Sequence, residues 1–201
     1  MFLKKAQVKN FIRNVAVYPI YGVLFCLLTS FSASSETATE VDLRVNKSRA
    51  TVKTFAGKLV KELKQALEEG GPVKAIKVCN IEAPQIAGEL SEQHKLRIGR
   101  TSLKIRNPNN EADAWEQAVL QQFEQRKLQG EDIATLEYFE ETEKGFRYMK
   151  AIPTKGLCLA CHGEALSESV KTTLTEYYPN DKATGFKTGD IRGAFTLIQK
   201  D

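Results

Sequence analysis

The sequence predicts an α+β domain with an antiparallel sheet and a long N-terminal helix, preceded by a short appendage. In the first part of this domain, apolar residues recur at three- and four-residue spacing, which is the period of a helix. In its second part, short runs alternate between apolar and polar residues, with a short polar loop between two of them. Helices followed by strands that are joined mostly by hairpins are typical of a single α+β domain. A chain of 201 residues is long enough for one such domain and an appendage.

Residues 1–34 have the composition of an export signal. Four basic residues and no acidic one precede a mostly apolar run, Val15 to Phe31, which ends in the small residues "SASS". This order is that of a cleaved secretory signal. The alternative is an uncleaved anchor, because a run of 17 such residues can nearly span a bilayer. We expect a leader at 1–34 and a single domain at 35–201 that is exported to the periplasm and contacts the membrane only if the leader is retained.

The leader accounts for the net positive charge of the chain. It contains four of the 29 Lys and Arg residues and none of the 25 Asp and Glu residues, so residues 35–201 hold 25 of each and are formally neutral. The charge therefore gives no support for a nucleic-acid partner. Export would also place the domain where exposed thiol pairs oxidise unless something occupies them.

The predicted domain begins with two helices. Apolar spacing predicts the first helix over 41–69, and the Gly-Gly pair at 70–71 ends it. Pro72 suits the first turn of a second helix. On that helix the spacing places Cys79 on the apolar face, where its side chain should point inward. Pro84 is expected to kink the second helix or to begin a new one.

The remaining elements follow from periodicity and from turn residues. Alternation predicts strands, helical spacing predicts helices, and Asn, Pro and Gly mark the turns. In chain order we expect a strand at 95–103, a turn at 106–110, a helix at 111–127, a hairpin of strands 134–140 and 146–152 with a five-residue loop, a helix at 166–177, a Gly- and Asp-rich loop at 179–190, and a final strand at 193–199.

Cys158, Cys161 and His162 form the sequence C-x-x-C-H, which is the attachment signature of c-type haem. Each thiol adds across one porphyrin vinyl group as a thioether. Residues three apart in a helical turn lie on one side of the chain, so both sulfurs can reach the two vinyl groups. The next residue, a histidine, then lies under the iron as the proximal ligand. The sequence thus predicts one covalent haem c.

Other uses of this motif are less well supported. A structural zinc site uses four ligands, usually two such pairs, and the residues left to complete one, Cys79 and His94, are distant in sequence. A thioredoxin-like dithiol sits near a βαβ pattern, which this sequence does not display. A Cys158–Cys161 disulfide in an exported binding module would give His162 no role.

The second axial ligand of such a haem has three candidates after the leader, which are His94, Met149 and Cys79. His94 lies in a polar segment, where a solvated surface histidine is the ordinary case. Met149 lies in a predicted strand, where a core role is the default. Cys79 lies on the apolar face of a predicted helix, where a small buried side chain is also common. The residues alone rank Cys79 first and leave the other two open.

The haem propionates would need donors or water. Arg100, Lys104 and Arg106 in the segment "GRTSLKIR", together with Arg192 at the end of the last loop, are candidates for this contact. For each of them the alternative is an ordinary solvated charge.

Several segments together resemble a known family, the single-haem c-type domain first described as a cyanobacterial protein of unknown function and found also as the sensor part of bacterial signalling proteins. The resemblance implies a PAS-like fold, in which helices flank an antiparallel sheet. It also implies His/Cys axial ligation, with the proximal histidine at His162 and the distal cysteine at Cys79. The matching segments keep the family's order and span nearly the whole predicted domain: "VCNIEAPQIA" (78–87), "GRTSLKIRNPNN" (99–110), "AWE" (114–116), "GFRYMKAIP" (145–153), "CLACHGE" (158–164) and "YPNDKATGFKTGDIRGAF" (178–195).

These patterns favour a haem protein that is not an enzyme. The first expected function is a redox-responsive sensor or a low-potential electron carrier, because a thiolate ligand stabilises ferric iron. Such a domain would act through a separate redox or signalling partner protein. The alternative is a sensor of CO, NO or O2 in which Cys79 leaves the iron on reduction. A peroxidase is less favoured, because only His94 is left to serve as a distal proton shuttle.

Overall fold

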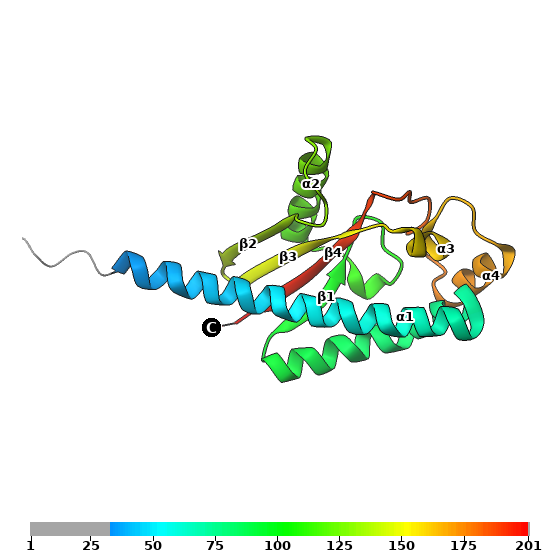
Figure 1. Ribbon diagram of the computed structural model, residues 1–201, viewed down its shortest axis with the longest axis horizontal. Helices are drawn as coiled ribbons and strands as arrows, with labels where there is room; N and C mark the ends of the chain where they lie inside the picture. The colour runs from blue at the N-terminus through cyan, green and yellow to red at the C-terminus, as the bar shows by residue number, and fades with distance from the viewer. Residues whose placement is uncertain (1–32, 201) are drawn as a thin grey trace, which may run out of the picture.

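The structure is a computed structural model that describes residues 33–200 (Figure 1). The predicted leader at 1–34 lies outside the described residues, apart from its last two, which begin the first helix. Among the described residues, no helix is both long and apolar enough to cross a membrane. The elements in chain order are α1 (Ala33–His94), β1 (Arg97–Thr101), η1 (Pro108–Asn110), α2 (Ala114–Leu128), β2 (Glu137–Thr142), β3 (Gly145–Pro153), η2 (Gly156–Cys158), α3 (Leu159–His162), α4 (Glu168–Tyr177) and β4 (Ile191–Gln199).

Helix α1 consists of two helical segments joined by a sharp reversal. Gly71 has φ +67° and ψ −164°, a conformation that residues with a side chain rarely adopt. The segments 33–69 and 72–94 therefore run back along each other (Figure 1), whereas the Gly-Gly-Pro sequence predicted only that one helix ends and another begins there. Pro84 does not begin a new helix, because only Gly70 and Gly71 leave helical backbone angles within α1. Buried apolar residues on both sides of this proline hold the second segment against the domain.

The sheet has four antiparallel strands in the order β1-β4-β3-β2. The last strand of the chain, β4, lies between β1 and β3. It pairs with β1 from Arg97↔Ile198 to Thr101↔Ala194, and with β3 along its other edge. The C-terminal strand therefore joins the first strand to the central hairpin.

The hairpin of β2 and β3 is tighter than predicted. Thr142 pairs with Gly145, so the connection has two residues, Glu143 and Lys144, instead of five. Strand β2 also begins at Glu137 instead of residue 134. The residues before it form a turn, in which the backbone N–H of Thr135 donates to the Asp132 carbonyl at 2.9 Å, and this turn takes these backbone groups out of strand pairing.

Helices cover both faces of the sheet. Side chains of β3 alternate between the faces, as strand geometry requires: Phe146 and Tyr148 pack with α1, whereas Met149 and Ala151 pack with α2. The result is an α+β domain with a four-stranded antiparallel sheet and a long N-terminal helix, as predicted, and consistent with a PAS-like arrangement. The helix side chains of the two clusters are Val45, Val52, Phe55, Ile86 and Leu90 from α1, and Val119, Leu120 and Phe123 from α2.

A third apolar cluster joins α4 to the second segment of α1. Ile76 of α1 packs with Val170 and Leu174 of α4, and Cys161 lies partly buried against the same cluster. This packing brings the C-x-x-C-H segment to the helix that carries Cys79.

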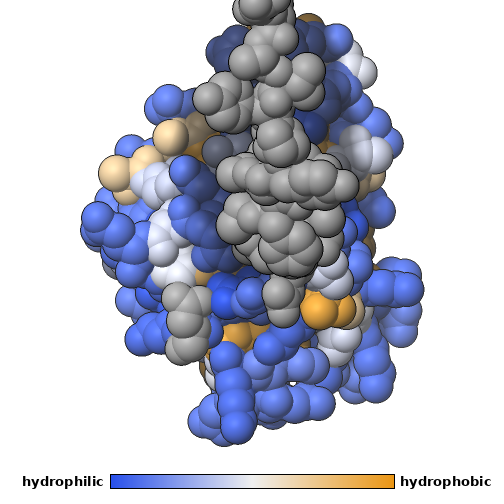
Figure 2. Space-filling model, turned by 90° about the vertical axis from the view of Figure 1, so that its left-hand side faces the viewer, coloured by the Kyte–Doolittle hydropathy of each residue, from blue (hydrophilic) through white to orange (hydrophobic). Residues whose placement is uncertain are grey.

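Polar contacts also tie the first segment of α1 to the sheet. Arg49 pairs with Glu137 of β2, and the hydroxyl of the buried Tyr148 donates to the same carboxylate at 2.7 Å. The Gln199 amide at the end of β4 donates to the Ser48 hydroxyl at 2.8 Å. On the face shown in Figure 2, hydrophilic side chains predominate and apolar ones are scattered among them.

Candidate functional site

The C-x-x-C-H residues lie in a compact turn that follows β3 directly. Residues 156–158 form a 3-10 turn, and 159–162 continue it as a short helix. The two cysteines are free and partly buried. The Cys161 sulfur faces the Pro72 carbonyl at 3.9 Å, so the turn lies at the reversal of α1. The two cysteines are three residues apart. Residues at this spacing on a helical turn lie on the same side of the chain, as the motif requires.

The imidazole of His162 is held in one tautomer. Its Nδ1 lies 2.7 Å from the Ala183 carbonyl oxygen, and a carbonyl can only accept, so Nδ1 carries the proton and Nε2 keeps its lone pair. Burial, followed by repulsion from Arg192 and Arg106, holds the pKa of His162 well below its usual value. The ring is therefore neutral near pH 7, and Nε2 can serve as a metal ligand. A hydrogen bond from the other ring nitrogen is the usual way in which proteins orient such a ligand.

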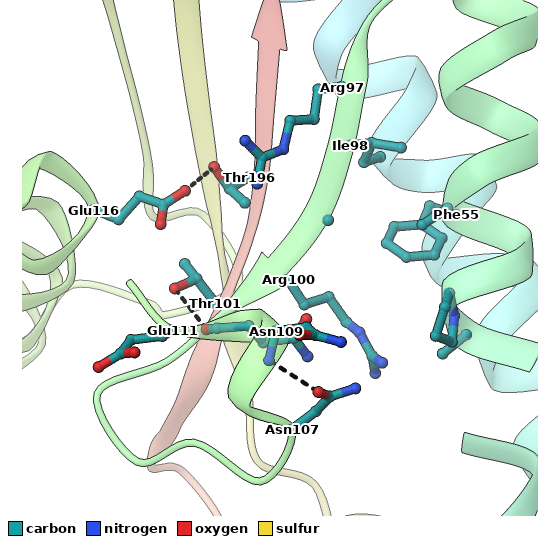
Figure 3. Close-up of a pocket in the computed structure, with 15 residues that line it drawn as sticks. Phe55, Arg97, Ile98, Arg100, Thr101, Asn107, Asn109, Glu111, Glu116 and Thr196 are labelled. Atoms are coloured by element: carbon teal, nitrogen blue, oxygen red, sulfur yellow. Dashed lines mark hydrogen bonds between the residues drawn. The ribbon is translucent and has the colours of Figure 1, made fainter. Parts of the chain in front are cut away.

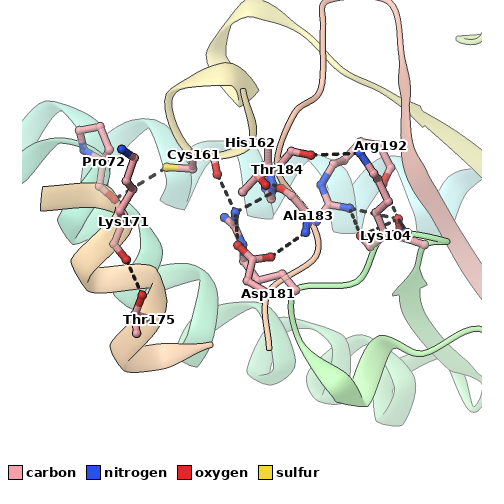
Figure 4. Close-up of polar contacts among 12 residues, drawn as sticks. Pro72, Lys104, Cys161, His162, Lys171, Thr175, Asp181, Ala183, Thr184 and Arg192 are labelled. Atoms are coloured by element: carbon pink, nitrogen blue, oxygen red, sulfur yellow. Dashed lines mark hydrogen bonds and ion pairs between the residues drawn. The ribbon is translucent and has the colours of Figure 1, made fainter. Parts of the chain in front are cut away.

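The loop at 179–190 wraps the motif. The backbone N–H of Phe186 donates to the His162 carbonyl at 2.9 Å, and that of Gly185 donates to the Gly163 carbonyl at 3.0 Å. The Phe186 ring also contacts the imidazole edge-on, with the centroids 6.2 Å apart. The Lys104 ammonium donates to the Thr184 carbonyl, so this lysine holds the loop (Figure 4).

Cys79 belongs to the same site. It lies in the second segment of α1 and is partly buried. Burial raises the pKa of its thiol, while the charges of Arg100, Arg106 and Arg192 act in the opposite direction. The charge of the Cys79 thiolate also acts to raise the pKa of Cys161, after the larger effect of burial. The same three guanidinium groups act to lower the pKa of the His162 imidazole. The fold thus brings Cys79 to the three residues of the C-x-x-C-H motif, which lie about 80 positions later in the chain.

The other two candidates for the distal ligand lie elsewhere. Met149 is fully buried in the apolar cluster under α2, which is the ordinary role of a strand methionine. His94 is the last residue of α1 and is partly exposed. At a rise of about 1.5 Å per residue, it lies about 22 Å along the helix from Cys79.

Three guanidinium groups and one carboxylate belong to the site. Arg106 forms an ion pair with Asp181 at 2.9 Å. Arg192 donates to the Ser102 hydroxyl, and burial together with the charges of Arg106 and Arg100 lowers the pKa of Arg192 to about 10. Within residues 33–200, the side chain of Arg100 has no hydrogen bond or ion pair, and burial lowers its pKa. The group has three positive charges and one negative one, so it can accept about two further negative charges.

The structure adds residues that the sequence did not single out. Asp181, which lies in the predicted Gly- and Asp-rich loop, is the carboxylate that pairs with Arg106, and Ala183 supplies the carbonyl that orients His162. No sequence signal distinguishes a loop carboxylate that is buried from one that is solvated. Among the described residues, no group of three or more Cys, His, Asp or Glu side chains could hold a metal ion.

A cavity of about 240 Å³ opens beside Arg100, between the second segment of α1 and β1 (Figure 3). Ala83, one helical turn after Cys79, is part of its wall. The Asn107 side chain accepts from the Asn109 backbone N–H at 3.0 Å, so this loop is shaped as a turn, as predicted. The remaining lining residues are Phe55, Pro84, Ala87, Arg97, Ile98, Gly99, Thr101, Asn110, Glu111, Glu116 and Thr196.

The fold and the site define a class of protein, an α+β domain with flanking helices and a C-x-x-C-H turn packed against a cysteine-bearing helix. Within that class, the chain belongs to the Tll0287-like family, whose sequence model matches residues 27–199.

A solved structure of similar fold agrees with this assignment. It is the crystal structure of the cyanobacterial heme-protein Tll0287, which superposes with a TM-score of 0.64 at 22% sequence identity. The match covers 79% of this chain and 95% of that one. At this identity the likeness concerns the fold. Among curated proteins, none is detectably similar to this chain in sequence.

Proposed function

We propose that this chain binds one haem c, held by thioethers to Cys158 and Cys161, with His162 as the proximal ligand and Cys79 as the distal ligand. The observation that carries the proposal is the hydrogen bond from His162 Nδ1 to the Ala183 carbonyl, which leaves Nε2 free to bind iron. The two free thiols, three residues apart, directly precede this histidine. The similarity in fold to a heme-protein supports it. Covalent attachment takes place on the exported side of a membrane, so the proposal includes export by the leader.

The charges of the site fit the group. A haem has two propionates, and the three guanidinium groups have an excess of two positive charges over Asp181. Arg100 and Arg192 have no carboxylate partner among the described residues, so we assign the propionates to these two. Arg106 is already occupied by Asp181, so its expected propionate contact is the weaker one.

Haem would supply one-electron redox chemistry at this site. The residues of the chain set how that chemistry is tuned. The three guanidinium groups favour the thiolate form of Cys79 against the effect of its burial. A thiolate ligand stabilises ferric iron relative to ferrous iron, so the reduction potential should lie below that of a His/Met-ligated haem. We therefore propose a redox-responsive sensor or a low-potential electron carrier that acts through a partner protein.

A second function, gas sensing, is favoured by one observation. The cavity beside Arg100 includes Ala83, one turn from Cys79, and so provides open space next to the proposed distal side. If Cys79 leaves the iron on reduction, CO, NO or O2 could bind there. Addition of CO to the reduced protein decides this question, because an unchanged absorption spectrum excludes the gas-binding function.

The test of the proposed ligation compares ferric spectra of wild type and Cys79→Ala, both produced with haem-attachment machinery. We expect wild type to carry covalent haem with low-spin thiolate features, and Cys79→Ala to keep the haem and lose those features. Met149→Leu preserves volume and serves as the control with an unchanged spectrum. A protein without covalent pigment would refute haem c, and an unchanged Cys79→Ala spectrum would refute cysteine ligation.

A further inference from the structure

A buried ion pair connects three elements behind the proximal histidine (Figure 4). Arg106 follows β1 and its turn, whereas Asp181 lies in the loop at 179–190, 75 positions later in the chain. Their side chains are only 10% and 9% exposed. A charge pair this buried is costly unless its geometry and its further hydrogen bonds compensate for the lost solvation.

Arg106 binds the backbone directly before His162, and Asp181 binds the backbone of the residue that orients the His162 ring. Arg106 Nη2 donates to the Cys161 carbonyl at 2.6 Å, and Nε and Nη2 donate to Asp181 Oδ2 at 3.1 and 2.9 Å. Asp181 Oδ1 accepts from the Ala183 backbone N–H at 2.8 Å. The Ala183 carbonyl then accepts from His162 Nδ1 at 2.7 Å and from Arg106 Nη2 at 3.3 Å.

These bonds close a ring. One side of the pair fixes the peptide that precedes His162, and the other side fixes the residue whose carbonyl orients the imidazole. Arg106 and His162 both donate to the Ala183 carbonyl oxygen. The hydrogen bond from the guanidinium therefore weakens this oxygen as an acceptor for Nδ1–H. Neither Arg106 nor Asp181 needs to touch the haem to influence it.

We propose that Arg106 and Asp181 are positioning residues, which together fix the tautomer and orientation of His162 and thereby tune the iron. The inference rests on the proposed haem function. It assigns Arg106 a role different from propionate binding, and it assigns a role to Asp181 of the loop at 179–190.

The two charges predict opposite effects on the reduction potential. Removing the positive charge in Arg106→Gln disfavours the added electron and frees the Ala183 carbonyl to bind Nδ1–H more strongly, so the potential should fall. Removing the negative charge in Asp181→Asn should raise it. Both variants should lose the single, well-defined ferric low-spin signal in electron paramagnetic resonance, because the imidazole is no longer held in one orientation.

The matched control is Lys187→Gln. It removes a charge from the same loop, where Lys187 forms an exposed ion pair with Glu164, and it should change neither the potential nor the signal. Arg106→Lys keeps the charge but not the planar fork. The reduction potential of Arg106→Lys should stay close to that of wild type, whereas the single low-spin resonance signal should still be lost. Unchanged potential and signal in Arg106→Gln, Arg106→Lys and Asp181→Asn would overturn the proposal.

A second readout does not depend on haem. The chain has two histidines, so ¹⁵N-histidine spectra of the full chain produced without haem-attachment machinery contain two imidazoles, and His94→Asn assigns them. We expect His162 in the Nδ1–H tautomer in wild type and a mixture of tautomers in Asp181→Asn. The same tautomer in both would overturn the inference. If wild type carries no covalent haem, the proposed function is refuted. The tautomer measurement would then still decide whether Arg106 and Asp181 hold the imidazole of His162.

Discussion

Tyr148→Phe tests the polar contacts that join the first segment of α1 to the sheet. The Tyr148 side chain is fully buried, and its hydroxyl donates to Glu137 Oε2 at 2.7 Å. The Arg49 guanidinium binds the same carboxylate, with Nε at 3.1 Å from Oε1. The substitution removes one hydroxyl and leaves the ring packing of the strand unchanged, so the loss in stability reports this hydrogen bond.

The expected magnitude follows from the charge and exposure of the acceptor. A hydrogen bond to a charged group contributes about 1.5–3 kcal/mol. The Glu137 side chain is 20% exposed and keeps its Arg49 partner, so water can replace part of the loss. We therefore expect a loss of about 1.5 kcal/mol in the free energy of unfolding, at the lower end of that range. For a domain of this size this corresponds to a decrease of about 3–6 °C in Tm.

The effect should depend on pH with a defined sign. The hydrogen bond from Arg49 is the main cause that lowers the pKa of Glu137 in the folded state, and the Tyr148 hydroxyl adds to it. The folded pKa is thus below the unfolded value of about 4.3. The stabilisation is present above the unfolded pKa and is lost as the pH falls through the folded pKa. The difference between wild type and Tyr148→Phe should be full at about pH 7 and shrink below about pH 4.

Urea unfolding at pH 7 and at pH 3.5 provides the measurement. The matched control is Tyr138→Phe on the neighbouring strand, where the hydroxyl has no hydrogen bond among the described residues, and where we expect a change within about 0.5 kcal/mol. Equal losses for the two variants at pH 7, or a Tyr148→Phe loss that does not shrink in acid, would refute this account of the contacts.

Two further predictions concern the core and the reversal of α1. Phe123→Ala, at a fully buried position, should lower the free energy of unfolding by about 3–5 kcal/mol in urea titrations, whereas Leu128→Ala, at a side chain 77% exposed, should change it by less than about 0.5 kcal/mol. Gly71→Ala should destabilise by about 1–3 kcal/mol, because φ is +67° there, whereas Gly57→Ala, inside the helix with open space around it, should stabilise by about 0.5–1 kcal/mol. Similar values for the two glycine variants would contradict the reversal.

Local signals in the sequence predicted the elements well. The Gly-Gly-Pro sequence at 70–72 predicted the end of one helix and the start of the next, and the structure shows that the chain also reverses there, at backbone angles that glycine tolerates. The spacing of Cys158 and Cys161 predicted a helical turn, and the structure has one over residues 156–162. Element boundaries shifted where side chains or turns compete with periodicity, as at the start of β2.

Long-range pairing was beyond such signals. Nothing in the alternation of β4 indicates that it inserts between β1 and β3, because the register of a strand depends on partners far along the chain. The role of Asp181 depends in the same way on Arg106, 75 positions away. Sequence alone could rank Cys79 first among three residues, whereas the three guanidinium groups that act on its thiol appear only in the folded chain.

The reversal of α1 also has a mechanical consequence. The segment 33–69 is one uninterrupted rod, and at about 1.5 Å per residue it is about 55 Å long. One end adjoins Pro72, against which Cys161 lies, and the other reaches the first described residues (Figure 1). Because the rod has no joint between these ends and packs on the sheet through Val45, Val52 and Phe55, a displacement at the reversal can reach the far end only if the whole rod slides against the sheet.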